Sequence, residues 1–191
     1  SLSAENLEIT EAGGVMPNPE LGWVHKAMDV CRAAECDCVL AVGGGSAIDA
    51  AKTIAVGVYN NCSPWDIMTG QKVSKGTLPV FTVLTIAAAG SETSSSAVLT
   101  NEKNQIKKGY NSVYNRPLVS FMNPELTFTL PPYQTACGIT DILMHTLERY
   151  FSGLEDEEPT DLIAESILKT TISSGLAALK DPNDYEARAS I

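Results

Sequence analysis

Two apolar runs in which hydrophobic and polar residues do not alternate stand out along the chain, at residues 38–42 and 80–84. A strand that is buried on both faces of a parallel sheet has this pattern. Apolar residues recur at helical spacing over residues 21–34, and residues 47–58 also favour a helix. The sequence therefore predicts helices on either side of the first buried strand.

The remaining strand candidates are shorter. Further strands are expected at residues 7–10, 96–100 and 118–122, with a polar turn at 101–104 and a turn-rich segment at 60–77. Strands that alternate with helices predict an α/β fold with a doubly wound, mostly parallel sheet.

The pattern changes near residue 128, beyond which no strand is predicted. Helices are expected at 132–152 and 159–179, each with a proline near its start. We therefore predict a nucleotide-binding α/β domain over 1–128 and the beginning of an all-helical domain over 129–191. Because the chain starts without Met and stops just after a further helix start at Asp181-Pro182, we expect an internal fragment of a longer protein.

Composition excludes several classes of partner. The chain has 191 residues, 44% of them hydrophobic, and a formal net charge of −10, which argues against nucleic acid or an anionic membrane as a partner. Its five cysteines have no disulfide-like spacing, which indicates reduced thiols and a cytoplasmic location. We also expect no signal peptide and no apolar run near the ~18 residues that span a bilayer.

The segment Gly43-Gly44-Gly45-Ser46 joins the first buried strand to the helix that follows it. Glycines let the backbone approach a phosphate, and the free N–H groups at a helix N-terminus hold the negative charge. Ser46 is a good residue for the N-cap. The segment matches neither the G-x-G-x-x-G fingerprint nor a P-loop, so a tight turn without a ligand stays the alternative.

A second loop, residues 85–92, follows the other buried strand. Ligands of α/β proteins bind where parallel strands end, so this loop is a second candidate for contacts with a cofactor. Close packing of its small residues is the alternative.

Asp141 and His145 are four residues apart on a predicted helix and therefore share one face, which Glu148 extends. A carboxylate and an imidazole suit Fe²⁺ or Zn²⁺. A catalytic metal usually takes at least three protein ligands, so a solvated helix face stays the alternative for these residues.

Taken together and in this order, the motifs resemble the iron-containing (group III) alcohol dehydrogenases, most closely their butanol dehydrogenase branch. The resemblance covers nearly the whole chain, and the matching segments are residues 17–19, 41–52, 90–92, 122–125, 130–132 and 138–141, with His145 and Glu148. One departure is the loop 85–92, Thr-Ile-Ala-Ala-Ala-Gly-Ser-Glu, which has fewer hydroxyl groups than the Thr-Thr-x-Gly-Thr-Gly-Ser-Glu loop usual in the family.

The resemblance implies a set of site residues. Gly44, Gly45 and Ser46 would bind the pyrophosphate of NAD or NADP, Asp49 would lie near the cofactor, Thr85 and Ile86 would line the nucleotide pocket, and Lys108 would reach the ribose. Asp141 and His145 would be the first two of four ligands to a divalent metal, Fe²⁺ in the first place and Zn²⁺ as the alternative. The two remaining histidine ligands would lie beyond Ile191, and the first strand of the family before Ser1.

The resemblance also implies an activity: a metal-dependent oxidoreductase, active as a homodimer, that interconverts a primary alcohol and an aldehyde by hydride transfer. The fragment alone is expected to be inactive. A glycerol or sugar-phosphate dehydrogenase of the same superfamily is one alternative, and an inactive nucleotide-binding module is another. The sequence leaves open the choice between NAD and NADP, the chain length of the substrate and the native metal.

Overall fold

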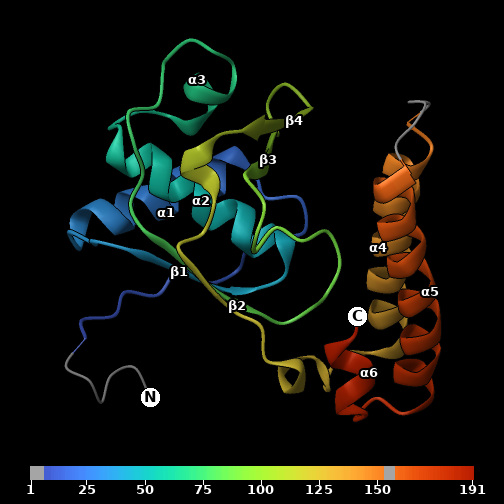
Figure 1. Cartoon of the computed structure of the whole chain (residues 1–191). Coiled ribbons are helices and arrows are strands. Elements are labelled where there is room, and N and C mark those ends of the chain that lie inside the picture. Colours follow the sequence, from blue (N-terminus) through green and yellow to red (C-terminus); the bar gives the residue numbers. More distant parts are fainter. Residues whose placement is uncertain (1–6, 153–157) are drawn as a thin grey trace. The chain divides into compact units, whose positions relative to one another are not determined.

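The computed structural model describes residues 7–152 and 158–191 (Figure 1). The chain divides into two compact units. The first unit takes in the chain up to Thr82 together with Ser91–Ser120, and the second takes in Val83–Gly90 together with Phe121–Ile191. The domain boundary near residue 128 stays a prediction.

A three-stranded parallel sheet runs through the first part of the chain. Its strands are β1 (Val39–Gly43), β2 (Val80–Leu84) and β5 (Val119–Phe121), in the order β1-β2-β5. Helix α2 (Gly45–Tyr59) lies between β1 and β2 in the chain, as a crossover between parallel strands requires. The predicted mixed α/β fold is confirmed.

Helix α2 is the centre of the first unit. It packs against α1 (Leu21–Ala33), β1 and β3 (Ser96–Asn101), so every residue from Ala50 to Gly57 is buried. The core between these elements is made of small and medium-sized apolar side chains: Val24, Ala27, Met28, Cys31, Ala50, Ile54, Met68 and Leu99. The helix that follows the glycine turn is therefore held on several sides at once.

An antiparallel hairpin of β3 and β4 (Ile106–Asn111) covers part of α2. Its register runs from Ser96 opposite Asn111 to Asn101 opposite Ile106. The predicted strand at 96–100 and the turn at 101–104 are confirmed, but β4 was not predicted because its residues are mostly polar and exposed. Pairing with β3 makes this segment a strand.

Two short helices were also missed within the first unit. Helix α3 (Pro64–Met68) lies in the segment predicted to be turns, and the hydroxyl of Ser63 caps it by accepting a hydrogen bond from the N–H of Trp65. The 3-10 helix η2 (Val113–Asn115) follows β4. Both are too short to produce a recognisable apolar period.

Two strand predictions need correction. Residues 7–10 form no strand: Leu7 and Ile9 are exposed, and a strand needs a neighbouring strand with which to exchange hydrogen bonds. Strand β1 was predicted to be buried on both faces, but only Ala41 is buried, while Leu40 is 39% and Val42 is 62% exposed. The described chain therefore covers one face of β1 only.

The described residues of the second unit that follow β5 are mainly helical. They form the 3-10 helix η3 (Pro124–Thr127) and the helices α4 (Pro132–Tyr150), α5 (Glu158–Lys180) and α6 (Tyr185–Ala189). The long helices α4 and α5 pack side by side (Figure 1), and their bounds match the predicted ones to within two residues. Buried Arg188 of α6 donates a 3.0 Å hydrogen bond to Thr135 Oγ1 in the first turn of α4.

Helix α5 is long and apolar enough, by length and composition alone, to cross a membrane. This corrects the expectation that no segment comes near the length that spans a bilayer. One such helix is weak evidence for a membrane segment, because the core helices of soluble proteins pass the same test. The absence of a membrane partner stays a prediction.

Gly138 of α4 lies directly against the backbone of the loop that follows β2. A Cβ atom added there would clash with the carbonyl oxygen of Ala87 and lie 3.6 Å from Ile86 Cγ1. We therefore expect Gly138→Ala to separate this loop from α4 and to lower the unfolding free energy by about 1–3 kcal/mol, the usual cost of overpacking.

Urea denaturation of the whole protein that carries this chain measures the effect. Cys137→Ala is the matched control, because Cys137 is the exposed neighbour of Gly138 on the same helix and its substitution should change stability by less than about 0.5 kcal/mol. Equal stability of the two variants would contradict the close packing at Gly138.

Candidate functional site

The turn between β1 and α2 depends on a glycine at position 43. Gly43 has a φ of 153°, and a Cβ atom there would lie 2.8 Å from the Cβ of Ala47. Glycine avoids this clash, which lets the chain pass from the end of the strand directly into the helix. The predicted order of strand, glycine turn and helix is present.

Helix α2 begins with amides that no side chain caps. Gly44 is the N-cap residue, in an extended conformation, and makes no side-chain capping hydrogen bond. Its carbonyl accepts the first helical hydrogen bond, from Ile48 N–H at 3.1 Å. The N–H groups of Gly45, Ser46 and Ala47 have no acceptor inside the helix and can therefore bind an anion.

Ser46 is not the N-cap, in contrast to the prediction. The helix starts one residue before it, and its hydroxyl oxygen instead accepts a 3.3 Å hydrogen bond from the backbone N–H of Asn18. The side chain of Asn18 in turn accepts a 2.6 Å hydrogen bond from the ammonium of Lys107. Asn18 therefore connects a positively charged group to the first turn of α2.

Lys107 was missed by the sequence analysis, which selected its neighbour Lys108. The two residues follow each other on β4, so their side chains leave opposite faces of the strand. Lys107 pairs across the hairpin with Thr100 and Lys108 pairs with Leu99, and both lysines are exposed. Only the fold distinguishes the two lysines, and the role of Lys108 stays a prediction.

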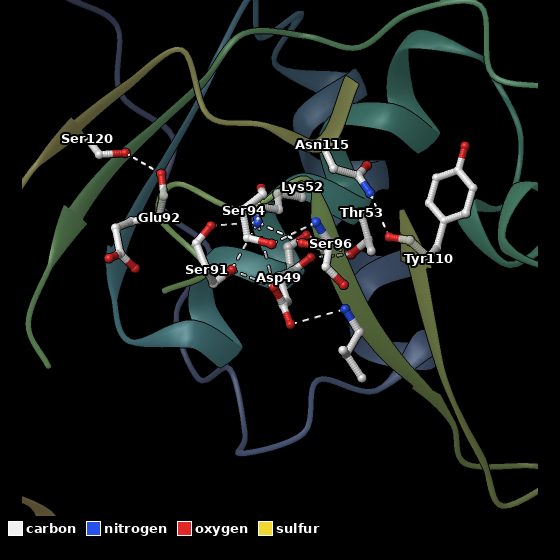
Figure 2. Close-up of polar contacts among 12 residues, drawn as sticks. Asp49, Lys52, Thr53, Ser91, Glu92, Ser94, Ser96, Tyr110, Asn115 and Ser120 are labelled. Carbon is white, nitrogen blue, oxygen red and sulfur yellow. Dashed lines mark hydrogen bonds and ion pairs between the residues drawn. The ribbon is translucent and has the colours of Figure 1, made fainter. Parts of the chain in front are cut away.

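Asp49 and Lys52 share one face of α2 and bind the loop that leads into β3 (Figure 2). The ammonium of Lys52 donates to the carbonyl oxygens of Ser91 (2.6 Å), Ser94 (3.0 Å) and Ser96 (2.7 Å), and it lies 3.0 Å from Ser91 Oγ. The hydroxyl of Ser91 donates to Asp49 Oδ1 at 2.6 Å, and Val98 N–H donates to Asp49 Oδ2 at 3.1 Å. Both carboxylate oxygens of Asp49 are therefore engaged by the protein itself.

This network is buried and charged. Lys52 is 1% exposed, and burial lowers the pKa of Lys52 to about 8, although the carboxylates of Asp49 and Glu92 favour its charged form. Burial also raises the pKa of Asp49, while the hydrogen bond from Ser91 and the charge of Lys52 lower it. No local pattern in the chain signals this network, because Lys52 and its acceptors are about 40 residues apart.

Thr85 and Ile86 follow the end of β2 and are partly buried. Ile86 lines a cavity of about 20 Å³ within the second unit, together with Ala87, Leu130, Ile139 and others. A cavity of this size holds about one water molecule and is too small for a nucleotide. The assignment of Thr85 and Ile86 to a nucleotide pocket stays a prediction.

Asp141 and His145 lie together on α4, as predicted. Asp141 Oδ1 is 3.6 Å from His145 Nε2, and both side chains are nearly half exposed. Two ligands about 2.1 Å from a tetrahedral ion are about 3.4 Å apart, so the pair fits a metal without a large rearrangement. Within residues 7–152 and 158–191, no group of three or more His, Cys, Asp or Glu side chains could hold a metal ion.

With this geometry in place, comparison with known proteins gives the family. The family model described as iron-containing alcohol dehydrogenase matches residues 1–124. The chain belongs to the iron-containing alcohol dehydrogenase family. The predicted resemblance is confirmed, including the likeness to butanol dehydrogenases.

Relatives in this family match the chain along its whole length. It is 43% identical over 190 residues to NADH-dependent butanol dehydrogenase A of Clostridium acetobutylicum, with 100% of this chain and 49% of the relative covered. It is 37% identical to the NADPH-dependent aldehyde reductase YqhD of Escherichia coli, with 98% and 49% covered. The chain therefore spans about half the length of these relatives.

Solved structures of similar proteins match the fold of this chain. The crystal structure of an NADH-dependent butanol dehydrogenase A from Thermotoga maritima matches with a TM-score of 0.94 and 41% identity, covering 99% of this chain and 47% of that one. A sulfoacetaldehyde reductase from Bifidobacterium kashiwanohense, solved in complex with NAD⁺, matches with a TM-score of 0.84 and 31% identity, covering 94% and 48%.

The free amides of α2 lead to a direct prediction. In the whole protein, Gly44→Val should weaken binding of NADH or NADPH at least tenfold, because a branched side chain at the N-cap obstructs the approach of a phosphate to the amides. Fluorescence titration measures the dissociation constant.

Gly13→Ala is the matched control, because a Cβ atom at Gly13 would have no neighbour within 4 Å. An unchanged cofactor affinity in a folded Gly44→Val variant would show that the turn is only a structural connection.

Proposed function

We propose that the whole protein that carries this chain interconverts a primary alcohol and an aldehyde by transferring a hydride to or from NAD(P). The observation that carries the proposal is the first turn of α2, which presents uncapped amides directly after Gly43 and Gly44. A pyrophosphate is the kind of anion that such a helix start binds. Relatives named as butanol dehydrogenases and an aldehyde reductase supply the substrate class.

The cofactor would be held chiefly by backbone groups. The amides of Gly45 and Ser46 would bind the pyrophosphate, with Gly44 leaving room for its approach. The ammonium of Lys107, held near this turn by Asn18, is a better candidate for a charged contact than Lys108. Asp49 would act through Ser91, because its oxygens are already engaged. These contacts suit NADH and NADPH equally, and the relatives include proteins named as dependent on each.

A divalent metal would be held in part by Asp141 and His145, with Fe²⁺ favoured by the family and Zn²⁺ as the alternative. When bound, such an ion supplies Lewis-acid polarisation of an alcohol or carbonyl oxygen. In this scheme Asp141 and His145 would bind the ion through a carboxylate oxygen and an imidazole nitrogen, which lie 3.6 Å apart on one helix face. Glu148 Oε2 lies 4.0 Å from His145 Nδ1, beyond hydrogen-bond distance, so we do not assign Glu148 to the metal site.

The remaining features of the assignment rest on composition and on the family. The net charge of −10 fits small-molecule substrates and disfavours nucleic acid. We also propose that the whole protein is a homodimer and that it is located in the cytoplasm.

The metal pair predicts a loss of metal in variants. In the whole protein, Asp141→Ala and His145→Ala should each lower the bound metal to less than about a tenth of the wild-type content, because the remaining ligands no longer complete the coordination. Elemental analysis of the purified proteins measures the metal.

Met144→Ala is the matched control on the same helix, because Met144 is the neighbour of His145 in the chain, is 58% exposed and lies outside the proposed ligand set. Wild-type metal content in both ligand variants would show that Asp141 and His145 are not metal ligands and only form part of a solvated helix face.

The activity itself is tested with butanol and butyraldehyde. The whole protein should show turnover near the typical enzyme scale of ~10 s⁻¹ with NAD(H) or NADP(H), and a chelator should abolish it. The 191-residue chain alone should show none, because two ligands hold a metal weakly. A whole protein that turns over neither substrate would refute the proposed function, and turnover by the mass-verified chain alone would refute its dependence on further ligands.

A further inference from the structure

We propose that Lys52 is a positioning residue for the cofactor, because its ammonium ties the loop 91–96 to α2 and so fixes Ser91 beside the first turn of that helix. The inference rests on the proposed function, in which this turn binds the pyrophosphate. Lys52 is not proposed to touch the cofactor, since its side chain is fully buried.

The loop is folded around a single charged group. Three of its carbonyl groups, from Ser91, Ser94 and Ser96, converge on the Lys52 ammonium at 2.6–3.0 Å (Figure 2). An ammonium has three N–H donors, which the three carbonyl oxygens share with Ser91 Oγ, 3.0 Å from Nζ. The path of the loop therefore follows from the position of Nζ, which α2 determines.

Ser91 is the point at which this loop meets the proposed cofactor site. A Cβ atom added to Gly45, the first residue of α2, would lie 3.8 Å from the Cβ of Ser91. The Ser91 hydroxyl already donates to Asp49 and lies 3.0 Å from Lys52 Nζ. Ser91 therefore shapes the side of the anion site through its position and not through a free hydroxyl.

An apolar side chain could fill the same space at a lower desolvation cost. A buried ammonium costs free energy unless it is well paired, and its burial alone lowers the pKa of Lys52. What an apolar residue lacks is the ability to hold three carbonyl groups at defined distances. Charge-assisted hydrogen bonds are short and directional, which suits a device that specifies geometry.

A direct electrostatic effect on the cofactor is the competing explanation. Lys52 follows Gly45 by seven residues, about 10 Å along the helix. Asp49 Oδ1 lies 4.0 Å from Lys52 Nζ, so an anion at the helix start experiences a nearly neutral pair. Lys52 therefore affects the cofactor through the position of the loop that it holds, more than through its charge.

The test compares Lys52→Met with wild type in the whole protein. Met has a similar length and no branching, so it fills the space but leaves the carbonyl groups without their donor. We expect the dissociation constant for the cofactor that wild type binds, NADH or NADPH, to rise about tenfold, with kcat at saturating cofactor within twofold of wild type. A merely structural role would lower kcat with the fraction of folded enzyme and leave the affinity unchanged, and that result would overturn the proposal.

Asn60→Ala is the matched control. Asn60 lies just after the other end of α2, and its side-chain amide donates to Gly76 O at 2.8 Å and Ser74 Oγ at 3.3 Å, so it also anchors a loop. Its loss should leave the cofactor affinity within twofold of wild type. A tenfold loss of affinity in Asn60→Ala as well would overturn the proposal, because any loosened loop would then have the same effect.

Two more variants complete the test. If Lys52→Met does not fold, Lys52→Gln takes its place. Glutamine keeps two N–H donors but is too short to contact all three carbonyl groups. Wild-type cofactor affinity in folded Lys52→Gln would overturn the proposal. In the double variant Asp49→Asn/Lys52→Met, the affinity should stay low, whereas recovery would assign the effect to the unpaired charge of Asp49. A wild-type protein that binds neither cofactor would refute the proposed function itself, which separates the two failures.

Discussion

The first unit depends on a helix that is covered on several sides and still begins with free amides. Helix α2 packs against α1, β1 and the hairpin, so a polar side chain on its inner faces has to find partners within the protein. Asp49 and Lys52 do so by binding the loop that leads into β3. The packing that buries α2 therefore also determines the position of the loop. The amides at the start of the helix lie beside this loop.

The price of this arrangement is the burial of two opposite charges. Such pairs contribute little net stability, because desolvation offsets most of their attraction. Their value in this unit is geometric: one ammonium orders a segment between β2 and β3 that has little regular backbone pairing of its own. This is why the loop can lie close to the helix start without a strand or a helix to support it.

The groups suited to the proposed chemistry are divided between the two compact units. The amides suited to a pyrophosphate belong to the first unit, and the carboxylate and imidazole suited to a metal belong to the second. Within the second unit, Gly138 brings α4 against the backbone at Ala87, so the loop after β2 is set by helix packing. The chain spans about half the length of its relatives, and each of the two sites that we propose draws on residues of one unit only.

The sequence by itself determined the features that arise locally. Apolar periodicity placed α1, and prolines near the helix starts marked α4 and α5. The run at 80–84 placed β2, and the glycines at 43–45 placed the turn, because each signal lies within or beside the element that it specifies. The four-residue spacing of Asp141 and His145 likewise sets their common helix face without any help from the rest of the fold.

Tertiary structure alone decided which polar groups meet. Strand β4 exists because β3 pairs with it, and that pairing directs Lys107 rather than Lys108 toward Asn18. The acceptors of Lys52 lie 39 to 44 residues away in the chain, a distance over which no local pattern carries information. The loop comes to Lys52 because a buried ammonium needs hydrogen-bond acceptors, and only the packed fold determines which acceptors are within reach.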